Sequence, residues 1–370
     1  MELALNGIDC GYIEGRLGGF KKSFLKEEQY IAMKNLSSLE EVFGYLETET
    51  DYGEYMQNEV ISISGLRNSL RQKLADEINL LESNGSEQFS EFLFYIKAGP
   101  MIDNVMNIVE GMKAGVTFSK LFAAIDPLGY FPELRQCEIG SSDLASMYEY
   151  VLIDSPVGKF FGNFLEKINT NRELRHFEEV QSFFREERPE KVRGALKRDL
   201  LESFASYCNQ LGSTSSEIMI DLLKLEADFR TLQVVYNSLD DNKEEREVVR
   251  CKLCPALGNL YPLHHGNLMA VDSLEYLSDS MRAFPRFKKM FNEVNSNVGG
   301  VSLEDLMYEE EVKEYSLVFD QQANLASYYA YIKLKEQEIR NIVWYAELIA
   351  RKLDKSHAGW RRIIIPFNNI

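Results

Sequence analysis

The sequence has no hydrophobic run long enough to cross a membrane and few of the residues that usually carry enzyme chemistry. No apolar stretch approaches the ~20 residues that a transmembrane helix needs. The first fifteen residues have no basic segment of the kind that opens a signal peptide. Histidine occurs only four times in 370 residues, so few side chains can act as a general base or a metal ligand. We therefore expect a soluble protein of the cytosol.

Motifs of the common nucleotide-binding and hydrolytic enzymes are missing too. There is no G-x-x-x-x-G-K-[S/T] phosphate loop, no G-x-S-x-G turn and no H-E-x-x-H zinc motif. The paired glycines at 18–19 and 299–300 lack the strand-to-helix context of a dinucleotide site. Carboxylates are abundant, but no pair of them stands apart as an acid and a base. The residues alone indicate no enzyme and no cofactor.

Basic residues are in the minority, with 41 Lys and Arg against 58 Asp and Glu and a net charge of −17. This balance argues against binding nucleic acid or anionic lipid through overall charge. The chain has five cysteines. An odd number in a long chain suits a reducing compartment better than a disulfide scaffold.

One cluster could carry metal or redox chemistry. Cys251, Cys254, His264 and His265 supply four side chains of the zinc-ligand type. Adjacent histidines diverge on most backbones, however, and a proline directly follows the second cysteine of the C-x-x-C pair. We interpret the two cysteines as structural thiols and keep a metal- or redox-dependent enzyme as an alternative function.

Hydrophobic periodicity predicts a mostly α-helical chain. An apolar stripe with spacings of three and four residues is typical of a helix that covers a core, and it comprises Leu66, Leu70, Leu74, Ile78 and Leu81. Ser38 and Ser142 are expected to cap helix N-termini. Only the run "RRIIIPF" at 361–367 looks like a strand, and it is short.

The segment 333–353, "KLKEQEIRNIVWYAELIARKL", has large apolar side chains on two sides. One stripe is the ordinary core-facing face of an amphipathic helix, and it comprises Ile339, Ile342, Val343, Ala346, Ile349, Ala350 and Leu353. Leu334, Trp344 and Tyr345 fall on the opposite side. A helix that faces water has little use for a tryptophan there. The segment is therefore sandwiched inside the protein or covered by a partner.

Three stretches of the chain resemble one another. They are "GPMIDNVMNI" from residue 99, "EADFRTLQVV" from 226 and "EQEIRNIVWY" from 336. The first two are followed by similar segments, "PLGYFPEL" at 127–134 and "ALGNLYPL" at 256–263. Two similarities in the same order predict three related helical modules.

The second and third repeats each contain a Glu and an Arg four residues apart, namely Glu226 with Arg230 and Glu336 with Arg340. Such pairs favour a surface helix by ~0.3–0.5 kcal/mol each. They could also line a cavity shared by the repeats. We prefer the surface interpretation, because the first repeat has Asp103 in place of the arginine.

Several longer stretches carry a resemblance to a known family. The strongest is "ANLASYYAYIKLKEQEIRNIVWYAELIA" (323–350). Others, in the same order as in the family, are "GYIEGRLGGFKKSFLKEEQYIAMKNLSSLEEV", "TDYGEYM", "MIDNVMNIVEG", "DPLGYF", "YVLIDSPVGKFF", "LGSTSSEIMIDLLKLEADFR" and "GNLYPL". These residues resemble the rotary ATPase subunits called d in vacuolar-type proton ATPases (V-ATPases) and C in archaeal-type enzymes. Long collinear matches are far more specific than one short motif.

The resemblance implies an all-α fold of three similar helical modules around a pseudo-threefold axis, forming a funnel or pyramid. We place the modules at 1–135, 136–265 and 266–370. The resemblance also implies that the protein is a non-catalytic rotor part of the V0 sector. Such a part passes torque from ATP hydrolysis in the catalytic head to the proton-carrying ring. A generic helical adaptor is the remaining alternative, and it does not explain the collinear matches.

The partners implied by the resemblance are the proteolipid c-ring, the central-stalk subunits D and F, and the N-terminal domain of subunit a. Membrane contact would be made only through the ring, on the cytoplasmic face of vacuolar or other endomembranes, and no nucleic acid is expected. From the repeat positions, we predict that Arg230 and Arg340 line the cavity that binds a partner, and that Trp344 is a buried anchor.

Three features depart from the family. The C-K-L-C sequence at 251–254 is not typical of it. Phe229 stands where relatives commonly carry a second basic residue. Residues 169–192 are longer and more charged than usual, and we interpret them as a peripheral helical extension.

Overall fold

The described part of the chain is helical, as the sequence predicts. The computed structural model describes residues 2–57, 60–138, 155–168, 188–212, 214–296, 301–321, 324–355 and 357–367. These ranges contain no β-strand, and the predicted all-α class is confirmed. The strand-like run at 361–367 ends a short 3-10 helix and continues as irregular backbone. The predicted cap Ser142 and most of the charged segment 169–192 lie outside the described residues.

The chain divides into two compact units. Unit 1 comprises Met1–Glu91, Ser213–Met219 and Ser278–Ile370, and unit 2 comprises Phe92–Gly212 and Ile220–Leu277. Each unit is therefore built from segments that are distant in sequence. The three modules and their pseudo-threefold arrangement stay a prediction.

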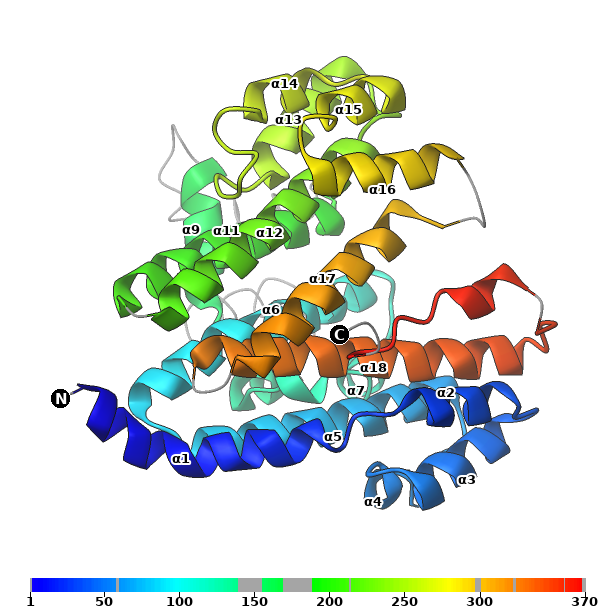
Figure 1. Cartoon of the computed structure of the whole chain (residues 1–370). Coiled ribbons are helices and arrows are strands. Elements are labelled where there is room, and N and C mark those ends of the chain that lie inside the picture. The colour runs from blue at the N-terminus through cyan, green and yellow to red at the C-terminus, as the bar shows by residue number, and fades with distance from the viewer. Residues whose placement is uncertain are drawn as a thin grey trace. The chain divides into compact units, whose positions relative to one another are not determined.

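Unit 1 contains the helices of both ends of the chain (Figure 1). They are α1 (Glu2–Lys21), α2 (Glu27–Lys34), α3 (Leu39–Glu49), α4 (Gly53–Met56), α5 (Ile63–Ser83), α16 (Pro285–Ser296), α17 (Leu303–Asp320), α18 (Leu325–Ala350) and η3 (Ala358–Arg361).

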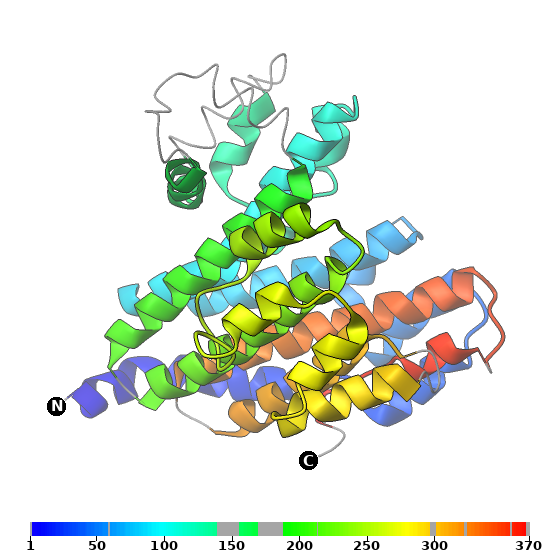
Figure 2. The ribbon, with the colours of Figure 1, turned by 90° about the horizontal axis from the view of Figure 1, so that it is seen from above.

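Unit 2 contains the middle of the chain, and both views show α11 next to α12 (Figures 1 and 2). Its elements are α7 (Phe118–Phe122), η1 (Pro127–Gly129), η2 (Pro132–Glu138), α9 (Gly158–Ile168), α11 (Pro189–Leu211), α13 (Lys243–Leu253) and α14 (His265–Ala270). Three helices contain residues of both units, namely α6 (Glu87–Lys113), α12 (Thr214–Asn237) and α15 (Leu274–Ser280).

Polar caps set where several helices begin. The Ser38 hydroxyl accepts the backbone N–H of Glu41 at the start of α3, as predicted. Ser302 and Asn324 do the same at α17 and α18. Because the first N–H groups of a helix lack partners within it, these side chains stabilise the observed start points.

The helix α18 is buried on two sides by unit 1 itself. It packs against α17, α5, α3, α1 and η3. The apolar stripe of α5, from Leu66 to Leu81, is no more than 1% exposed. On the far side of α18, Leu334 and Tyr345 are 0% and 5% exposed. Unit 1 itself therefore covers Leu334 and Tyr345, while Trp344 on the same side is half-buried.

The core of unit 2 joins α6, α9 and α11. Its apolar cluster includes Ile102 of α6, Phe160 of α9 and Leu196 of α11, each 0% exposed. Beside it, the ring of Tyr95 stacks on Phe204 and Tyr207, with centroids 5.2 and 4.9 Å apart. Burial of such large side chains is the main stabilising contribution of the unit.

Polar side chains on α6 and α12 hold the segments that follow these helices. Asn104 donates to the carbonyl of Asp126 at 2.9 Å and accepts the N–H of the same residue at 2.7 Å. On α12, Asp228 accepts the N–H groups of Asn259 and Leu260 at 3.1 and 2.9 Å. The segments held in this way are the two that resemble each other in sequence, 127–134 and 256–263.

A third such contact lies on α18. The Asn341 side chain donates to the carbonyl of Ile364 at 2.7 Å and accepts its N–H at 3.4 Å. Asn104 and Asn341 occupy the same position of the sequence repeat, whereas Asp228 lies one helical turn before the matching Thr231. All three repeats thus use a buried polar side chain to hold the returning backbone, and we call these contacts the three clamps.

Two glycines allow the returning segments to approach their helices. A Cβ on Gly129 would lie 2.4 Å from the carbonyl carbon of Pro100 in α6. Gly258 has φ +112°, and a Cβ there would lie 2.2 Å from Oδ1 of Asp228. Only glycine suits a positive φ combined with so close a contact.

Candidate partner-binding sites

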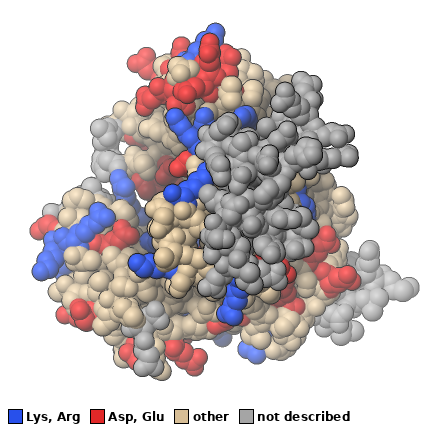
Figure 3. All heavy atoms as spheres, turned by 180° about the vertical axis from the view of Figure 1, so that it is seen from behind, with Lys and Arg blue, Asp and Glu red and all other residues tan. Residues whose placement is uncertain are grey.

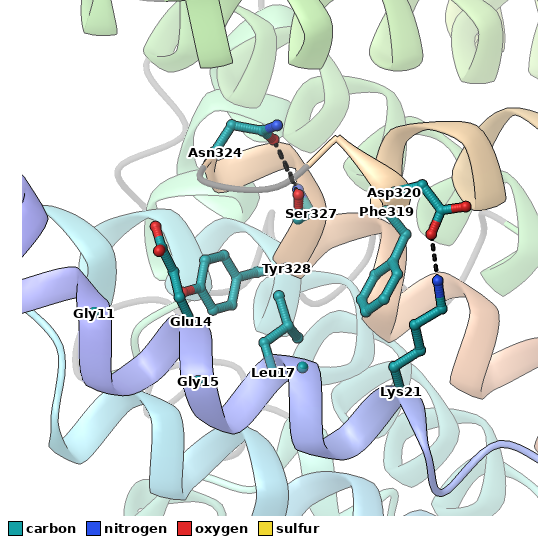
Figure 4. A pocket seen from close by; sticks show the side chains of 11 residues that line it. Gly11, Glu14, Gly15, Leu17, Lys21, Phe319, Asp320, Asn324, Ser327 and Tyr328 are labelled. Atoms are coloured by element: carbon teal, nitrogen blue, oxygen red, sulfur yellow. Dashed lines mark hydrogen bonds and ion pairs between the residues drawn. The ribbon is translucent and has the colours of Figure 1, made fainter.

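A groove of about 330 Å³ in unit 1 lies beside the N-terminal helix (Figure 4). Gly11, Gly15 and Gly18 of α1 form one wall, and Phe319 and Ser327, from α17 and α18, lie on the other. A Cβ on any of the three glycines would meet nothing within 4 Å among the described residues. A helix face without side chains lets another backbone approach closely. The side chains of Glu14, Leu17 and Lys21 of α1 also line the groove.

An ion pair borders the groove where α1 meets the end of α17. Lys21 pairs with Asp320 (Figure 4). The same ammonium group lies 5.5 and 4.9 Å from the ring centroids of Phe319 and Phe367. Cation–π contacts of this kind stabilise by about 0.5–1 kcal/mol at exposed sites. They connect α1, α17 and the end of the chain.

Charged side chains of α18 enter the core of unit 1. Lys335 and Glu338 are 1% and 0% exposed, and their charged atoms lie 2.7 Å apart. Glu338 also accepts the Tyr52 hydroxyl at 2.7 Å and the Leu25 N–H at 2.6 Å. Lys335 donates to the carbonyl of Ser23 at 3.2 Å. One ion pair thus joins α18 to the α1–α2 connection and to the residue that precedes α4.

A second buried pair lies on α5. Lys73 and Glu77, one turn apart, form an ion pair with side chains 9% and 10% exposed. Glu77 also accepts the hydroxyl of Tyr331 on α18 at 2.5 Å. Together the two pairs contain two positive and two negative charges, so the core carries no net charge from them. We call the two pairs and their tyrosines the buried charge cluster.

The tyrosines of this cluster stay protonated. Burial, and then the neighbouring Glu338, raises the pKa of Tyr52 well above its ordinary value. Burial and Glu77 do the same to the pKa of Tyr331. Each hydroxyl therefore acts as a donor to a carboxylate. The cluster thus consists of two buried hydrogen-bonded groups, one around Glu338 and one around Glu77.

Arg340 lies on the surface of unit 1. Its guanidinium group stacks on the ring of Tyr308 at 3.7 Å and donates to Gln337 at 2.5 Å. The predicted helix neighbour of Arg340, Glu336, is bound by Arg71 of α5 at 2.9 Å. Burial raises the pKa of Glu336, but Arg71, Lys333 and Arg340 together outweigh burial, and the net shift is downward. The stacking fixes the orientation of Arg340, and its role toward a partner stays a prediction.

Trp344 is half-buried and holds the C-terminal segment of its own chain. Its indole N–H donates to the carbonyl of Gly359 at 2.8 Å. The guanidinium group of Arg362 lies 6.0 Å from its ring centroid. Whether Trp344 also anchors a partner stays a prediction.

Arg230 belongs to unit 2. Its guanidinium donates to the carbonyl of Gly194 in α11 at 2.6 Å. Burial lowers its pKa, and Glu226 acts in the opposite direction. The preceding residue, Phe229, is 2% exposed and belongs to the apolar core. A role of Arg230 in a partner-binding cavity stays a prediction.

The structure does not favour the alternative of metal or redox chemistry at the cysteine and histidine cluster. Cys251 is exposed and Cys254 is buried. Burial raises the pKa of the Cys254 thiol to about 12, whereas a reactive cysteine needs a lowered pKa. In the part of the chain that the structure describes, no group of three or more His, Cys, Asp or Glu side chains could hold a metal ion.

None of the described helices combines the length and the apolar character that crossing a lipid bilayer requires. The described fold is all helical, and buried polar side chains hold its returning segments. The chain belongs to the family of ATP synthase (C/AC39) subunits, whose model matches residues 13–361. The family predicted from the sequence is confirmed.

Individual relatives match along nearly their whole length. V-type proton ATPase subunit d of Dictyostelium discoideum is 32% identical over 350 residues, which are 93% of this chain and 92% of the relative. The probable V-type proton ATPase subunit d 2 of Drosophila melanogaster is 31% identical over 354 residues, 95% and 96% of the two chains. Subunit d of Saccharomyces cerevisiae is 30% identical over 357 residues, again 95% and 96%. The relatives bear the name of subunit d, which confirms the prediction of a non-catalytic subunit.

Proposed function

We propose that the chain is the d-type subunit of a V-type proton ATPase and couples its central stalk to its membrane ring. The observation that carries this proposal is the similarity to subunit d over 95% of this chain and 96% of the yeast relative. The subunit would transmit torque and catalyse no reaction.

The proposed partners are the central-stalk subunits D and F, the proteolipid c-ring and the N-terminal domain of subunit a. The complex would place the chain on the cytoplasmic face of vacuolar or other endomembranes. A net charge of −17 supports contact with the ring rather than with lipid, because anionic headgroups repel an acidic surface. Membrane attachment would then depend on protein contacts.

The buried charge cluster and the clamps support a mechanical role. A part that transmits torque must deform little under load. Close-packed interiors have low compressibility, and a fully satisfied polar network further restricts how helices can slide. The cluster joins α18 to three other parts of unit 1, and the clamps attach the returning segments of both units.

We also propose that the chain consists of three related modules around a pseudo-threefold axis. The shared clamp on α6, α12 and α18 supports this repeat. Arg340 is the strongest of the three proposed contact residues, because it is exposed and its guanidinium is already held in place on Tyr308. Arg230 and Trp344 already donate hydrogen bonds to carbonyls of their own units. A partner would contact them in addition to these bonds.

The test is affinity purification of the tagged chain from detergent-solubilised membranes, with mass spectrometry of the associated proteins. We expect proteolipids together with subunits a, D and F. Recovery of the tagged chain without these subunits, while a tag on another pump subunit retains the intact complex, would contradict the proposal. Arg340→Ala would measure the contribution of this residue to proton pumping. Arg340→Lys, which keeps the positive charge but loses the planar stacking on Tyr308, would separate the charge from the stacking.

A further inference from the structure

The second half of α1 is loosely packed against the rest of unit 1. In the stretch 11–19, Ile13 and Leu17 are the buried large apolar side chains, at 2% and 6% exposed, whereas Tyr12 is 51% exposed. The groove of about 330 Å³ lies along the same stretch (Figure 4). Side chains that border it lack the close packing of a protein interior. By contrast, α18 is buried along most of its length.

The chain directly after α1 is held firmly. Phe24 and Leu25 are 7% and 3% exposed. The N–H of Leu25 donates to the buried Glu338 at 2.6 Å, which ties it to the buried charge cluster. The helix α1 therefore has one fixed end, while the stretch before that end is only weakly attached.

Lys21 forms the polar contacts that join the fixed end of α1 to another helix. It pairs with Asp320 at the end of α17, and its ammonium group lies over two phenylalanine rings (Figure 4). Earlier in α1, Arg16 donates to Tyr12 of the same helix at 3.0 Å, a bond that stays within α1. We call the contacts of Lys21 the latch.

Position rather than charge distinguishes the latch. Seen from behind, Lys and Arg lie beside Asp and Glu at many places on the described surface (Figure 3), and an exposed ion pair alone contributes little to stability. The latch adds two cation–π contacts to its ion pair, and it lies next to the firmly held chain. It can therefore keep a loosely packed helix in place.

The backbone of the loosely packed stretch is itself a poor helix former. It contains Gly11, Gly15, Gly18 and Gly19, all of them exposed. A Cβ on any of the four would meet nothing within 4 Å among the described residues, so alanine would fit at each position. Because glycine gains more freedom on unfolding than alanine, these residues make the helix easier to open.

We propose that the stretch 11–19 of α1 is a strap that opens from α17 and α18 by local unfolding while the rest of unit 1 stays folded. The latch at Lys21 sets how often the strap opens. Opening enlarges the groove on the side of Phe319 and Tyr328, and it gives an otherwise stiff unit one compliant element. This movement lies within unit 1 and requires no partner, so it goes beyond the proposed function.

Hydrogen exchange of the purified full-length chain tests the strap. Exchange is followed by mass spectrometry at single-residue resolution. The protection of the amides of 12–19 should be at least about a hundredfold lower than that of the amides of α5 and α18. Urea below the unfolding transition should leave their exchange unchanged, because local opening exposes little surface. Equal protection in α1 and α18, or a dependence on urea as steep as that of the core helices, would overturn the proposal.

The latch is tested by a neighbouring pair of substitutions. Lys21→Ala should speed exchange throughout 12–19 by about three- to tenfold, because it removes the ion pair and both cation–π contacts. Lys22→Ala, at an exposed neighbour, is the control and should have no effect. Ordinary fraying would instead give exchange rates that fall steadily from residue 2 to residue 21 and do not respond to Lys21→Ala. That result would also overturn the proposal.

Alanine substitutions test the contribution of the glycines. Gly11→Ala, Gly15→Ala and Gly18→Ala should each slow exchange in 12–19 about fivefold, and the triple variant roughly a hundredfold. Gly44→Ala on α3 is the matched control, since a Cβ there also meets nothing within 4 Å among the described residues, and it should leave exchange in α1 unchanged. An unaltered rate in the triple variant would overturn the proposal, because the helix would then not limit opening.

Discussion

The buried charge cluster of unit 1 and the buried Arg250 of unit 2 stabilise their charges in different ways. In unit 1, the buried charge cluster pairs Lys335 with Glu338 and Lys73 with Glu77, so each charge has an opposite charge beside it. In unit 2, Arg250 is 0% exposed, and it donates hydrogen bonds to uncharged oxygens. It donates to the Ser238 hydroxyl and to the carbonyls of Val235, Leu268, Met269 and Val271.

The position of these carbonyls explains how Arg250 can be buried. Three of them lie at the end of α14 and just beyond it, and the fourth lies in the last turn of α12. The last carbonyls of a helix lack partners within it and carry a partial negative charge. One guanidinium with five donors can satisfy several of them at once. Arg250 therefore joins two helix ends. Each pair of unit 1 instead lies within one helix, and its glutamate accepts a tyrosine hydroxyl from elsewhere in the unit.

The comparison shows which groups balance the buried charge in each unit. A pair in unit 1 is balanced, so removing one partner leaves the other charge buried without compensation. Arg250 and Asp228 in unit 2 are balanced by backbone groups, so changing them releases a segment of chain. The following substitutions test this difference.

Replacing Arg250 should have the largest effect. Arg250→Met keeps much of the side-chain volume but removes all donors to the two helix ends. We expect a loss of about 3–5 kcal/mol in the free energy of unfolding, measured by urea denaturation. Faster hydrogen exchange at 266–272 should accompany it. Arg246→Met is the control, because Arg246 makes one bond of 3.4 Å to Asp272; a similar loss in both variants would contradict the role of Arg250.

Breaking the Lys335–Glu338 pair should cost about 2–4 kcal/mol. Glu338→Gln leaves the Lys335 ammonium buried without its counter-charge. The double variant Glu338→Gln with Lys335→Met removes both charges and should lose less than the sum of the two single variants. A double-mutant cycle in urea checks this. Strictly additive losses would mean that the two charges do not depend on each other.

Changing the charge of the Asp228 clamp should cost about 1–2 kcal/mol. Both carboxylate oxygens accept hydrogen bonds, from Leu260 on one and from Asn259 on the other. Asp228→Asn keeps one acceptor and turns an NH2 group toward an N–H donor. Hydrogen exchange should increase at the Asn259 and Leu260 amides. Asp221→Asn on the same helix, whose side chain is 79% exposed, should leave both quantities unchanged.

The tyrosines of unit 1 should produce a smaller, pH-dependent effect. The pKa of Tyr331 is raised in the folded chain, so the unfolded chain releases this proton first as the pH rises. The contribution of Tyr331 to the free energy of unfolding is therefore complete below pH ~10 and is lost as the pH rises further. The free energy of unfolding of the unaltered chain should fall between pH 9 and 11. In Tyr331→Phe this fall should be smaller by about 1 kcal/mol. Tyr12→Phe, at a tyrosine 51% exposed, is the control, and an identical pH dependence in both variants would contradict this account.

Much of the helical fold could be predicted from the sequence. The α5 stripe from Leu66 to Leu81 and the cap at Ser38 follow from local periodicity and hydrogen bonding, and the structure shows both. The two-sided pattern of 333–353 correctly required cover on both faces. Sequence alone left open whether α18 is covered by its own unit or by a partner, because cover comes from helices up to hundreds of residues away.

The candidate sites were much less predictable. The pairing of Glu336 with Arg71 rather than Arg340 depends on how α5 packs against α18, which helix spacing does not contain. The groove beside Gly11, Gly15 and Gly18 needs α17 and α18 for its second wall. The exposure of Leu263 was likewise hidden, because its sequence neighbours resemble those of the buried Leu134.

The sequence by itself determined the helical class, the family and the three repeated stretches, since these depend on residue order and local spacing. Only the tertiary structure decided which repeated positions are clamps, which charges are buried and which leucine is left exposed. Burial and pairing are properties of side chains brought together from distant segments. No local pattern can specify them.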